Sequence, residues 1–142
     1  MIDQLKKYFE NRNDIAFAFL YGSYANGNAT NKSDIDIAVY FYPSERHPVE
    51  YEATVFYDSE SAIWSDLQKI LKKEVELLVF NRAPAVISSS AIRGIPIVIK
   101  DWGLYLDFME IITDIGDEYR DSVIHDFKEK LEVEKRHKSQ NH

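Results

Sequence analysis

Two aspartates separated by one residue carry the most distinctive chemistry in the sequence. Asp34 and Asp36 open a stretch rich in Ile and Val. Side chains alternate along a strand, so both carboxylates are expected on one face, about 7 Å apart at the backbone. Two carboxylates this close repel each other unless a cation lies between them. Mg²⁺ prefers such oxygen ligands and usually combines a few carboxylates with substrate phosphates, so the pair predicts a magnesium site.

A Gly-Ser turn upstream supplies the second half of the pattern. Gly22 and Ser23 follow an apolar run at residues 15–21, and ten residues separate Ser23 from Asp34. Glycine has no side chain to keep the backbone away from a phosphate, and serine offers an N–H and a hydroxyl to a phosphate oxygen. An Asp-x-Asp pair alone is also typical of sugar-nucleotide glycosyltransferases and of solvated strands. Combined with the Gly-Ser turn at this spacing, it predicts a site for a metal-bound nucleotide.

The Gly-Ser turn at 22–23 and the Asp-x-Asp pair at 34–36 resemble the signature of the polymerase-beta-type nucleotidyltransferase superfamily, in its minimal nucleotidyltransferase (MNT) members. Within that group the chain is most similar to the antitoxins of HEPN/MNT toxin–antitoxin systems, over about residues 15–100. The resemblance implies an antitoxin that transfers AMP from Mg-ATP to a tyrosine hydroxyl of a HEPN-domain RNase toxin. The toxin would be its partner in a hetero-oligomeric complex, and the transfer would block the RNase activity.

The resemblance also implies a role for each residue of the pattern. Gly22 and Ser23 would bind the triphosphate, and Asp34 and Asp36 would bind metal, in what resembles a two-metal Mg²⁺ site. The family has a third carboxylate on a later strand, where this chain has Glu76. Glu76 would complete the catalytic and metal-binding set, since a carboxylate beside the metal can lower the pKa of the attacking hydroxyl or accept its proton.

Two departures from the family pattern keep other functions open. Most relatives have Asp where this chain has Glu76, and Asn26 stands where relatives often carry Arg. The extra methylene of Glu moves the carboxylate by about an ångström, against the narrow tolerance of catalytic geometry. One alternative is therefore a weak or inactive antitoxin that acts by direct binding. The other is a small-molecule nucleotidyltransferase acting on antibiotics, whose acceptor pocket would have to be built by the helical region after Trp102.

The surrounding pattern predicts an α/β (α+β) nucleotidyltransferase fold, with a central mixed β-sheet flanked by helices and a long C-terminal helix. Apolar runs predict strands at residues 15–21, 34–42, 75–80 and 95–100. Pro96 predicts that the last strand lies at a sheet edge. On the third strand, alternation places Glu76 and Leu78 on the face opposite to Val75, Leu77 and Val79.

Helical spacing predicts an opening helix around residues 5–9, a second around 63–71 and a third from Pro84. Asp58, Ser59 and Ser61 are candidate caps of the second helix, and Gly94 fits the C-terminal cap of the third. A further helical stripe begins at Trp102, with a possible interruption at Gly116. Residues 22–33 are typical of a turn-rich loop, and residues 49–57 fit neither strand nor helix clearly.

Composition limits the class of protein. The length of 142 residues, of which 45% are hydrophobic and 29% charged, predicts a single globular domain. We expect this domain at residues 1–131, with its C-terminal helix at about 102–131, followed by a polar tail at 132–142. The net charge of -7 argues against direct nucleic-acid binding. The absence of cysteine excludes disulfides and thiolate metal sites. No apolar run approaches the ~20 residues that cross a bilayer, so we expect a cytoplasmic protein that does not bind membranes.

Overall fold

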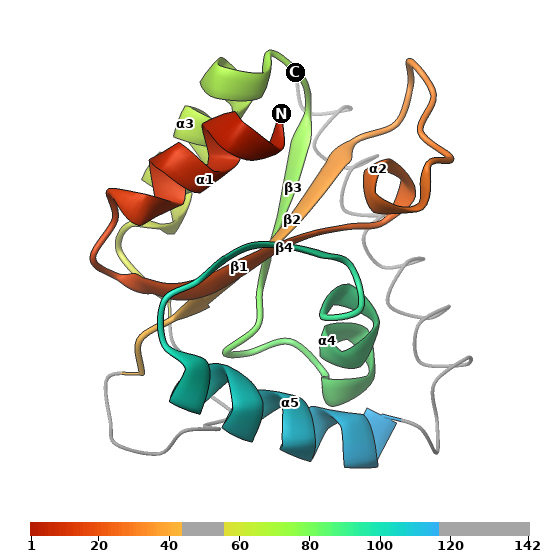
Figure 1. The fold of residues 1–142 in the computed structure, drawn as a ribbon. Helices are drawn as coiled ribbons and strands as arrows, with labels where there is room; N and C mark the ends of the chain where they lie inside the picture. The colour runs from red at the N-terminus through yellow and green to blue at the C-terminus, as the bar shows by residue number, and fades with distance from the viewer. Residues whose placement is uncertain (44–55, 117–142) are drawn as a thin grey trace.

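A four-stranded mixed sheet lies at the centre of the computed structural model, which describes residues 1–43 and 56–116 (Figure 1). The strand order is β3-β2-β1-β4. The strands are β1 (Ile15–Tyr21), β2 (Ile35–Phe41), β3 (Val75–Val79) and β4 (Ile95–Ile99). β2 and β3 are parallel, whereas β1 is antiparallel to both β2 and β4. The predicted mixed sheet is confirmed, and Pro96 lies on an edge strand as expected.

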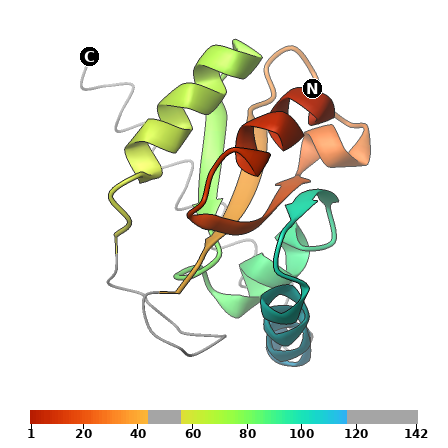
Figure 2. The ribbon, with the colours of Figure 1, turned by 60° about the vertical axis from the view of Figure 1, so that its left-hand side comes forward.

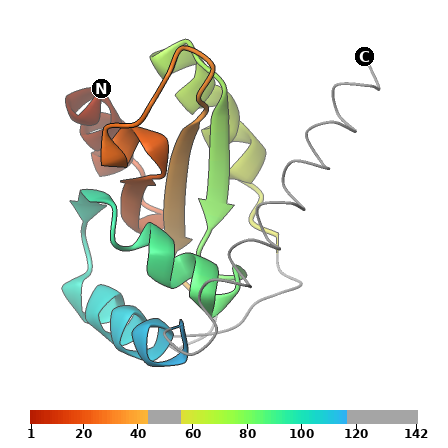
Figure 3. The ribbon, with the colours of Figure 1, turned by 90° about the vertical axis from the view of Figure 1, so that its right-hand side faces the viewer.

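Helices cover both faces of this sheet. They are α1 (Ile2–Glu10), α2 (Ser23–Asn26), α3 (Glu60–Leu71), α4 (Ala85–Ala91) and α5 (Trp102–Gly116). Figure 2 shows α1 and α3 side by side on one face, and Figure 3 shows α4 and α5 against the other. None of the helices in the described part of the chain is long and apolar enough to cross a membrane.

Each face of the sheet has its own apolar cluster, because β1 and β2 are buried on both sides. Leu5 and Phe9 of α1, with Ile63 and Leu67 of α3, recur at i and i+4 and pack on the first face. The α1/α3 cluster also contains Ile35, Ile37 and Val39 of β2, whereas the α4/α5 cluster contains Phe17, Phe19, Ala38, Tyr40, Leu78, Phe80 and Phe108. The alternation of β2 and β3 thus separates two cores, and the predicted faces of β3 are confirmed.

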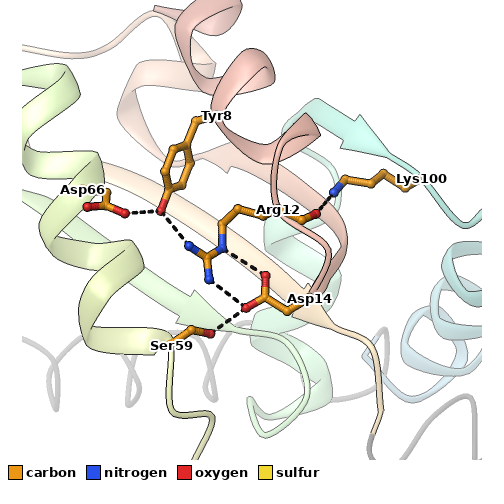
Figure 4. Close-up of polar contacts among 6 residues, drawn as sticks. All are labelled: Tyr8, Arg12, Asp14, Ser59, Asp66 and Lys100. Carbon is orange, nitrogen blue, oxygen red and sulfur yellow. Dashed lines mark hydrogen bonds and ion pairs between the residues drawn. The ribbon is translucent and has the colours of Figure 1, made fainter.

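Polar contacts join α1 and α3 at the end of the sheet where β1 begins (Figure 4). Arg12 donates to both carboxylate oxygens of Asp14, at 3.0 and 2.9 Å, and the Ser59 hydroxyl donates to Asp14 at 2.7 Å. The Tyr8 hydroxyl donates to Asp66 at 2.7 Å, and burial, followed by this hydrogen bond, raises the pKa of Tyr8 to about 12. Lys100 adds a hydrogen bond to the backbone oxygen of Arg12. These contacts fix the start of β1.

Several local predictions need correction. Residues 22–33 contain α2 as well as turns, since the chain forms one helical turn after Gly22 and leaves it through Gly27 in the left-handed region. Pro84 is the residue before α4, not in its first turn, and α4 ends at Ala91 without using Gly94 as a left-handed cap. Ser59 is at the N-cap position of α3 but caps no backbone N–H with its side chain.

Three sequence predictions fall wholly or largely outside the described residues. These are the unassigned segment at 49–57, the C-terminal part of the helix at 102–131 and the polar tail at 132–142. The helix itself is present as α5, which the structure describes to Gly116.

Candidate functional site

Tyr21, Asp36 and Glu76 form one row across three strands at one end of the sheet. Tyr21 pairs with Asp36 across the antiparallel β1 and β2, and Asp36 pairs with Glu76 across the parallel β2 and β3. Neighbouring strands lie about 4.8 Å apart, so residues in such a row are immediate neighbours. The polar row, as we call these three residues, brings two of the predicted carboxylates together from strands that are far apart in sequence.

The polar row faces the side of the sheet that α4 and α5 cover. The next row inward on that face consists of Phe19, Ala38 and Leu78, which pair with one another and belong to the α4/α5 cluster. Because side chains alternate, the residues two positions along each strand share this face. The polar row therefore lies at the edge of an apolar core, where Asp36 and Glu76 are each only partly buried.

Gly22 closes the polar row at the end of β1. Its φ of 72° and ψ of -151° belong to a region that is essentially restricted to glycine. A Cβ at this position would lie 2.2 Å from Oδ2 of Asp36 and 3.1 Å from its Cγ. Sequence reasoning assigned Gly22 to a close approach between backbone and phosphate. The structure shows that the backbone of this turn also lies directly against the Asp36 carboxylate.

Ser23 is the first residue of α2, immediately after Gly22, and is partly buried. The backbone N–H groups of Ala25 and Asn26 both donate to the Gly22 carbonyl oxygen at 3.1 Å. The helical turn thus begins at Gly22 and holds Ser23 beside the residue that contacts Asp36. Asn26, at the end of α2, is exposed.

Asp34 lies one residue before β2 and outside the polar row. The N–H of the following residue, Ile35, donates to the Glu74 carbonyl oxygen at 2.9 Å, so β2 and β3 begin together there. Among the described residues, no three His, Cys, Asp or Glu side chains converge closely enough to hold a metal ion. The structure pairs Asp36 with Glu76 in register, and it does not gather Asp34 with them into a three-carboxylate group.

The electrostatics of the polar row are visible in Tyr21. Burial raises the pKa of its phenol, and the negative charges of Asp36 and Glu76 raise this pKa further. The two carboxylates therefore create a negative potential on this face of the sheet. Sequence reasoning missed Tyr21, although alternation from Phe17 and Phe19 already placed it on one face with them. What the sequence could not supply was its pairing with Asp36.

These residues suit Mg²⁺. The ion prefers oxygen ligands and is usually bound through one or two protein carboxylates, with substrate phosphates and water completing its coordination. Asp36 and Glu76 supply two adjacent carboxylates. The Asp36 carboxylate occupies the space that a Cβ on Gly22 would fill.

Arg82, after β3, and Tyr24, in α2, have contacts away from the polar row. Arg82 pairs with Glu60 at the start of α3, through one hydrogen bond of 2.7 Å and a second, shorter one, and its guanidinium lies over Phe56. Tyr24 accepts a hydrogen bond of 2.7 Å from Lys73, and its ring packs on the α1/α3 cluster. Tyr24 therefore supports α2 from the face opposite to Asp36.

Comparison with known proteins agrees with this architecture. A family model described as polymerase beta, nucleotidyltransferase matches residues 3–102. No curated protein matches the chain. The fold is similar to a chain in a crystal structure of a toxin–antitoxin with AMP-PNP, with a TM-score of 0.62 and 20% identity over 89% of this chain and 98% of that one.

Two further solved structures are similar. A mutant of the toxin–antitoxin MntA-HpeT gives a TM-score of 0.64 at 19% identity, over 90% of this chain and 98% of that one. A rebuilt structure of the tri-AMPylated Shewanella oneidensis HEPN toxin in complex with an MNT antitoxin gives a TM-score of 0.52 at 17% identity, over 90% of this chain and 99% of that one. At these identities the likeness concerns the fold, and it confirms the fold class that the sequence predicted.

Proposed function

The chain belongs to the polymerase beta nucleotidyltransferase family, and on that premise we propose that it is an antitoxin that transfers AMP from Mg-ATP to a tyrosine hydroxyl of a HEPN ribonuclease. The observation that carries the proposal is the register pairing of Asp36 with Glu76, directly beside Gly22. The Gly-Ser turn and two carboxylates thereby meet at one end of the sheet. The fold is similar to those of toxin–antitoxin complexes, one of which contains an AMPylated HEPN toxin.

In this proposal Gly22 and Ser23 hold the triphosphate. Ser23 offers its backbone N–H and hydroxyl to phosphate oxygens, and Gly22 leaves the backbone accessible. Asp34, Asp36 and Glu76 would hold Mg²⁺, although the described residues show only the last two as register neighbours. Bound Mg²⁺ would stabilise the negative charge that develops on the phosphate and lower the pKa of the attacking hydroxyl.

The transfer forms a bond between the acceptor tyrosine oxygen and the α-phosphorus, and it breaks the bond between that phosphorus and the bridging oxygen of the β-phosphate. Pyrophosphate leaves with the electron pair. The triphosphate would lie at Gly22, and Glu76 is the carboxylate of the pair that lies farther from Gly22. We therefore assign Glu76, and not Asp36, as the group that accepts the proton of the acceptor hydroxyl. The apolar row of Phe19, Ala38 and Leu78 beneath lowers the local dielectric and strengthens these charge interactions.

Intact-mass measurement tests the proposal. The protein is incubated with Mg-ATP and a cognate HEPN-domain protein, and the mass of the HEPN protein is measured before and after. We expect a mass gain of one or more AMP units and a parallel loss of RNase activity. The variant Asp36→Asn should abolish the gain, whereas the matched control Asp58→Asn, at an exposed position outside the polar row, should leave it unchanged.

The same experiment separates transfer from neutralisation by contact. If the double variant Asp34→Asn with Asp36→Asn binds the HEPN protein and still suppresses its RNase activity, direct binding explains the protection and the enzymatic proposal is wrong. If the mass of the HEPN protein does not change with the unaltered chain, the proposal also fails.

A further inference from the structure

The strand β3 lies at one edge of the sheet, with β2 as its neighbour. On its inner side the Ile35 N–H donates to the Glu74 carbonyl oxygen at 2.9 Å. Farther along, the Phe80 N–H donates to the Val39 carbonyl oxygen, also at 2.9 Å. Backbone groups alternate sides along a paired strand, so the even-numbered residues of β3 direct theirs to β2. The N–H and C=O of Val75 therefore point to the outer edge.

Two side chains of α3 bond these outward groups. The indole N–H of Trp64 donates to the Val75 carbonyl oxygen at 2.8 Å, and the Val75 N–H donates to the side-chain oxygen of Gln68 at 3.3 Å. Trp64 and Gln68 are four residues apart, so they share the face of α3 that lies beside β3 (Figure 2). Both backbone groups of the first residue of the strand are thus held by the helix.

The bond from Trp64 acts on the peptide unit that joins Val75 to Glu76. A peptide unit is planar, so its carbonyl oxygen, its N–H and its two Cα atoms move together. Trp64 holds this unit at the carbonyl oxygen from the outer side, and pairing with Asp36 of β2 holds Glu76 from the inner side. The peptide unit therefore cannot turn freely, and the direction of the Glu76 side chain is restricted with it.

The place of Glu76 in the strand makes this support useful. Glu76 is the second residue of a strand of five, at the edge of the sheet. The chain enters the strand shortly after Lys72, whose φ of 55° lies in the left-handed region. Segment ends with few neighbours open more easily than the middle of a sheet. The bonds from α3 are made at the start of the strand, directly before the carboxylate of the polar row.

We propose that Trp64 is a positioning residue, whose indole N–H holds the peptide unit before Glu76 and thereby keeps the Glu76 carboxylate beside Asp36. This inference rests on the proposed function, because it takes Glu76 as the carboxylate that binds metal and accepts the proton. Loss of a group that orients a metal ligand typically costs about 10–100-fold in metal affinity or activity. Since Trp64 acts through the backbone, we expect an effect near the lower end of this range.

The test compares Trp64→Phe with Tyr8→Phe. Trp64→Phe keeps an aromatic ring and removes the N–H donor, and because Trp64 is 42% exposed, the smaller ring loses little buried packing. Tyr8→Phe is the matched control, since it also removes a hydrogen bond to α3, the one from the Tyr8 hydroxyl to Asp66, on the side of α1. Each substitution is made in the unaltered chain and in the Glu76→Gln chain.

Three quantities are measured for each protein. They are kcat for AMP transfer at saturating Mg-ATP, the affinity for Mn²⁺ without nucleotide, and the thermal unfolding midpoint. Mn²⁺ serves as a spectroscopic substitute for Mg²⁺, and free Mn²⁺ is followed by electron paramagnetic resonance. A residue that acts through Glu76 should lose its effect once Glu76 is replaced, whereas a general loss of structure should lower kcat in both chains alike.

We expect Trp64→Phe to lower kcat and Mn²⁺ affinity by about 10-fold in the unaltered chain, and to lower neither further in the Glu76→Gln chain. Tyr8→Phe should shift the unfolding midpoint without these losses. Losses of equal size with and without Glu76, or no loss at all in an active chain, would overturn the role of Trp64 alone. An unaltered chain that does not transfer AMP would overturn the proposed function and this inference with it.

Discussion

A Cβ on Gly22 would lie 2.2 Å from Oδ2 of Asp36, so the Asp36 carboxylate fits against the turn only because residue 22 is glycine. The contact couples the two halves of the sequence pattern. The Asp36 carboxylate lies against the turn, and Asp36 pairs with Glu76 on its other side. Any residue with a side chain at position 22 must displace a carboxylate that we propose as a metal ligand.

Gly22→Ala should therefore abolish AMP transfer. Displacement of a catalytic group by about 1 Å can cost about 100-fold in rate, and we expect a loss at least this large. Gly27→Ala is the matched control, because Gly27 also has a positive φ, of 77°, but nothing lies within 4 Å of its Cβ position. Both variants lose backbone stability, whereas only Gly22→Ala should lose transfer. Equal transfer by the two variants would contradict the coupling of turn and carboxylate.

Glu76→Gln should reduce transfer strongly while leaving the fold intact. Gln keeps the size of the side chain but can neither accept the proton nor bind metal as a carboxylate, so we expect a loss of about 100-fold or more. Glu74→Gln serves as the control, since Glu74 is an exposed neighbour just before β3. Initial rates of transfer to the HEPN protein and unfolding midpoints distinguish the effects. A Glu76→Gln rate like that of Glu74→Gln would remove Glu76 from the site.

The contrast between Glu76 and Tyr21 explains how much of the site the sequence could predict. The face of Glu76 followed from alternation along a single apolar strand, and the clusters confirm it. The pairing of both residues with Asp36 depends on register between separate strands, which long-range packing sets. The short helix α2 was missed for a related reason: four residues are too few to show helical periodicity.

Gly94 is a second position whose long-range contact could not be predicted from the sequence, and this contact affects stability. The sequence suggested a helix cap, which requires only local backbone freedom, whereas the structure shows contact with the backbone of β1. Because a carbonyl oxygen of a central strand cannot move aside, Gly94→Ala should lower the free energy of unfolding by about 1–3 kcal/mol. Gly103→Ala, within α5, meets only a side-chain oxygen of Asp101 at 3.4 Å and should be neutral or stabilising. Urea denaturation of both variants checks the prediction, and a Gly94→Ala protein as stable as Gly103→Ala would refute it.

Asp14 should make part of the stability depend on acid pH. The hydrogen bonds from Arg12 lower the pKa of Asp14 below its ordinary value of 3.8, with Ser59 adding to the effect and burial opposing it. A carboxyl group whose pKa is lower in the folded state stabilises the fold above its unfolded pKa, and this contribution is lost as the pH falls through the folded value. Asp14→Asn should therefore cost more stability at pH 7 than in acid, below the lowered pKa of folded Asp14, where the native carboxyl is protonated too.

The size of this effect should be modest, because the Arg12–Asp14 pair is partly exposed. We expect Asp14→Asn to lower the free energy of unfolding by about 1 kcal/mol at pH 7, through the lost ion pair and the weakened bond to Ser59. Urea midpoints at several pH values, with Asp58→Asn as an exposed control, measure the difference. AMP transfer should survive in Asp14→Asn at neutral pH, because Asp14 and Ser59 join α1 to α3 at the end of the sheet where β1 begins, whereas Asp36 pairs with the last residue of β1. A loss of stability that is the same at every pH would show that the charge of Asp14 contributes nothing.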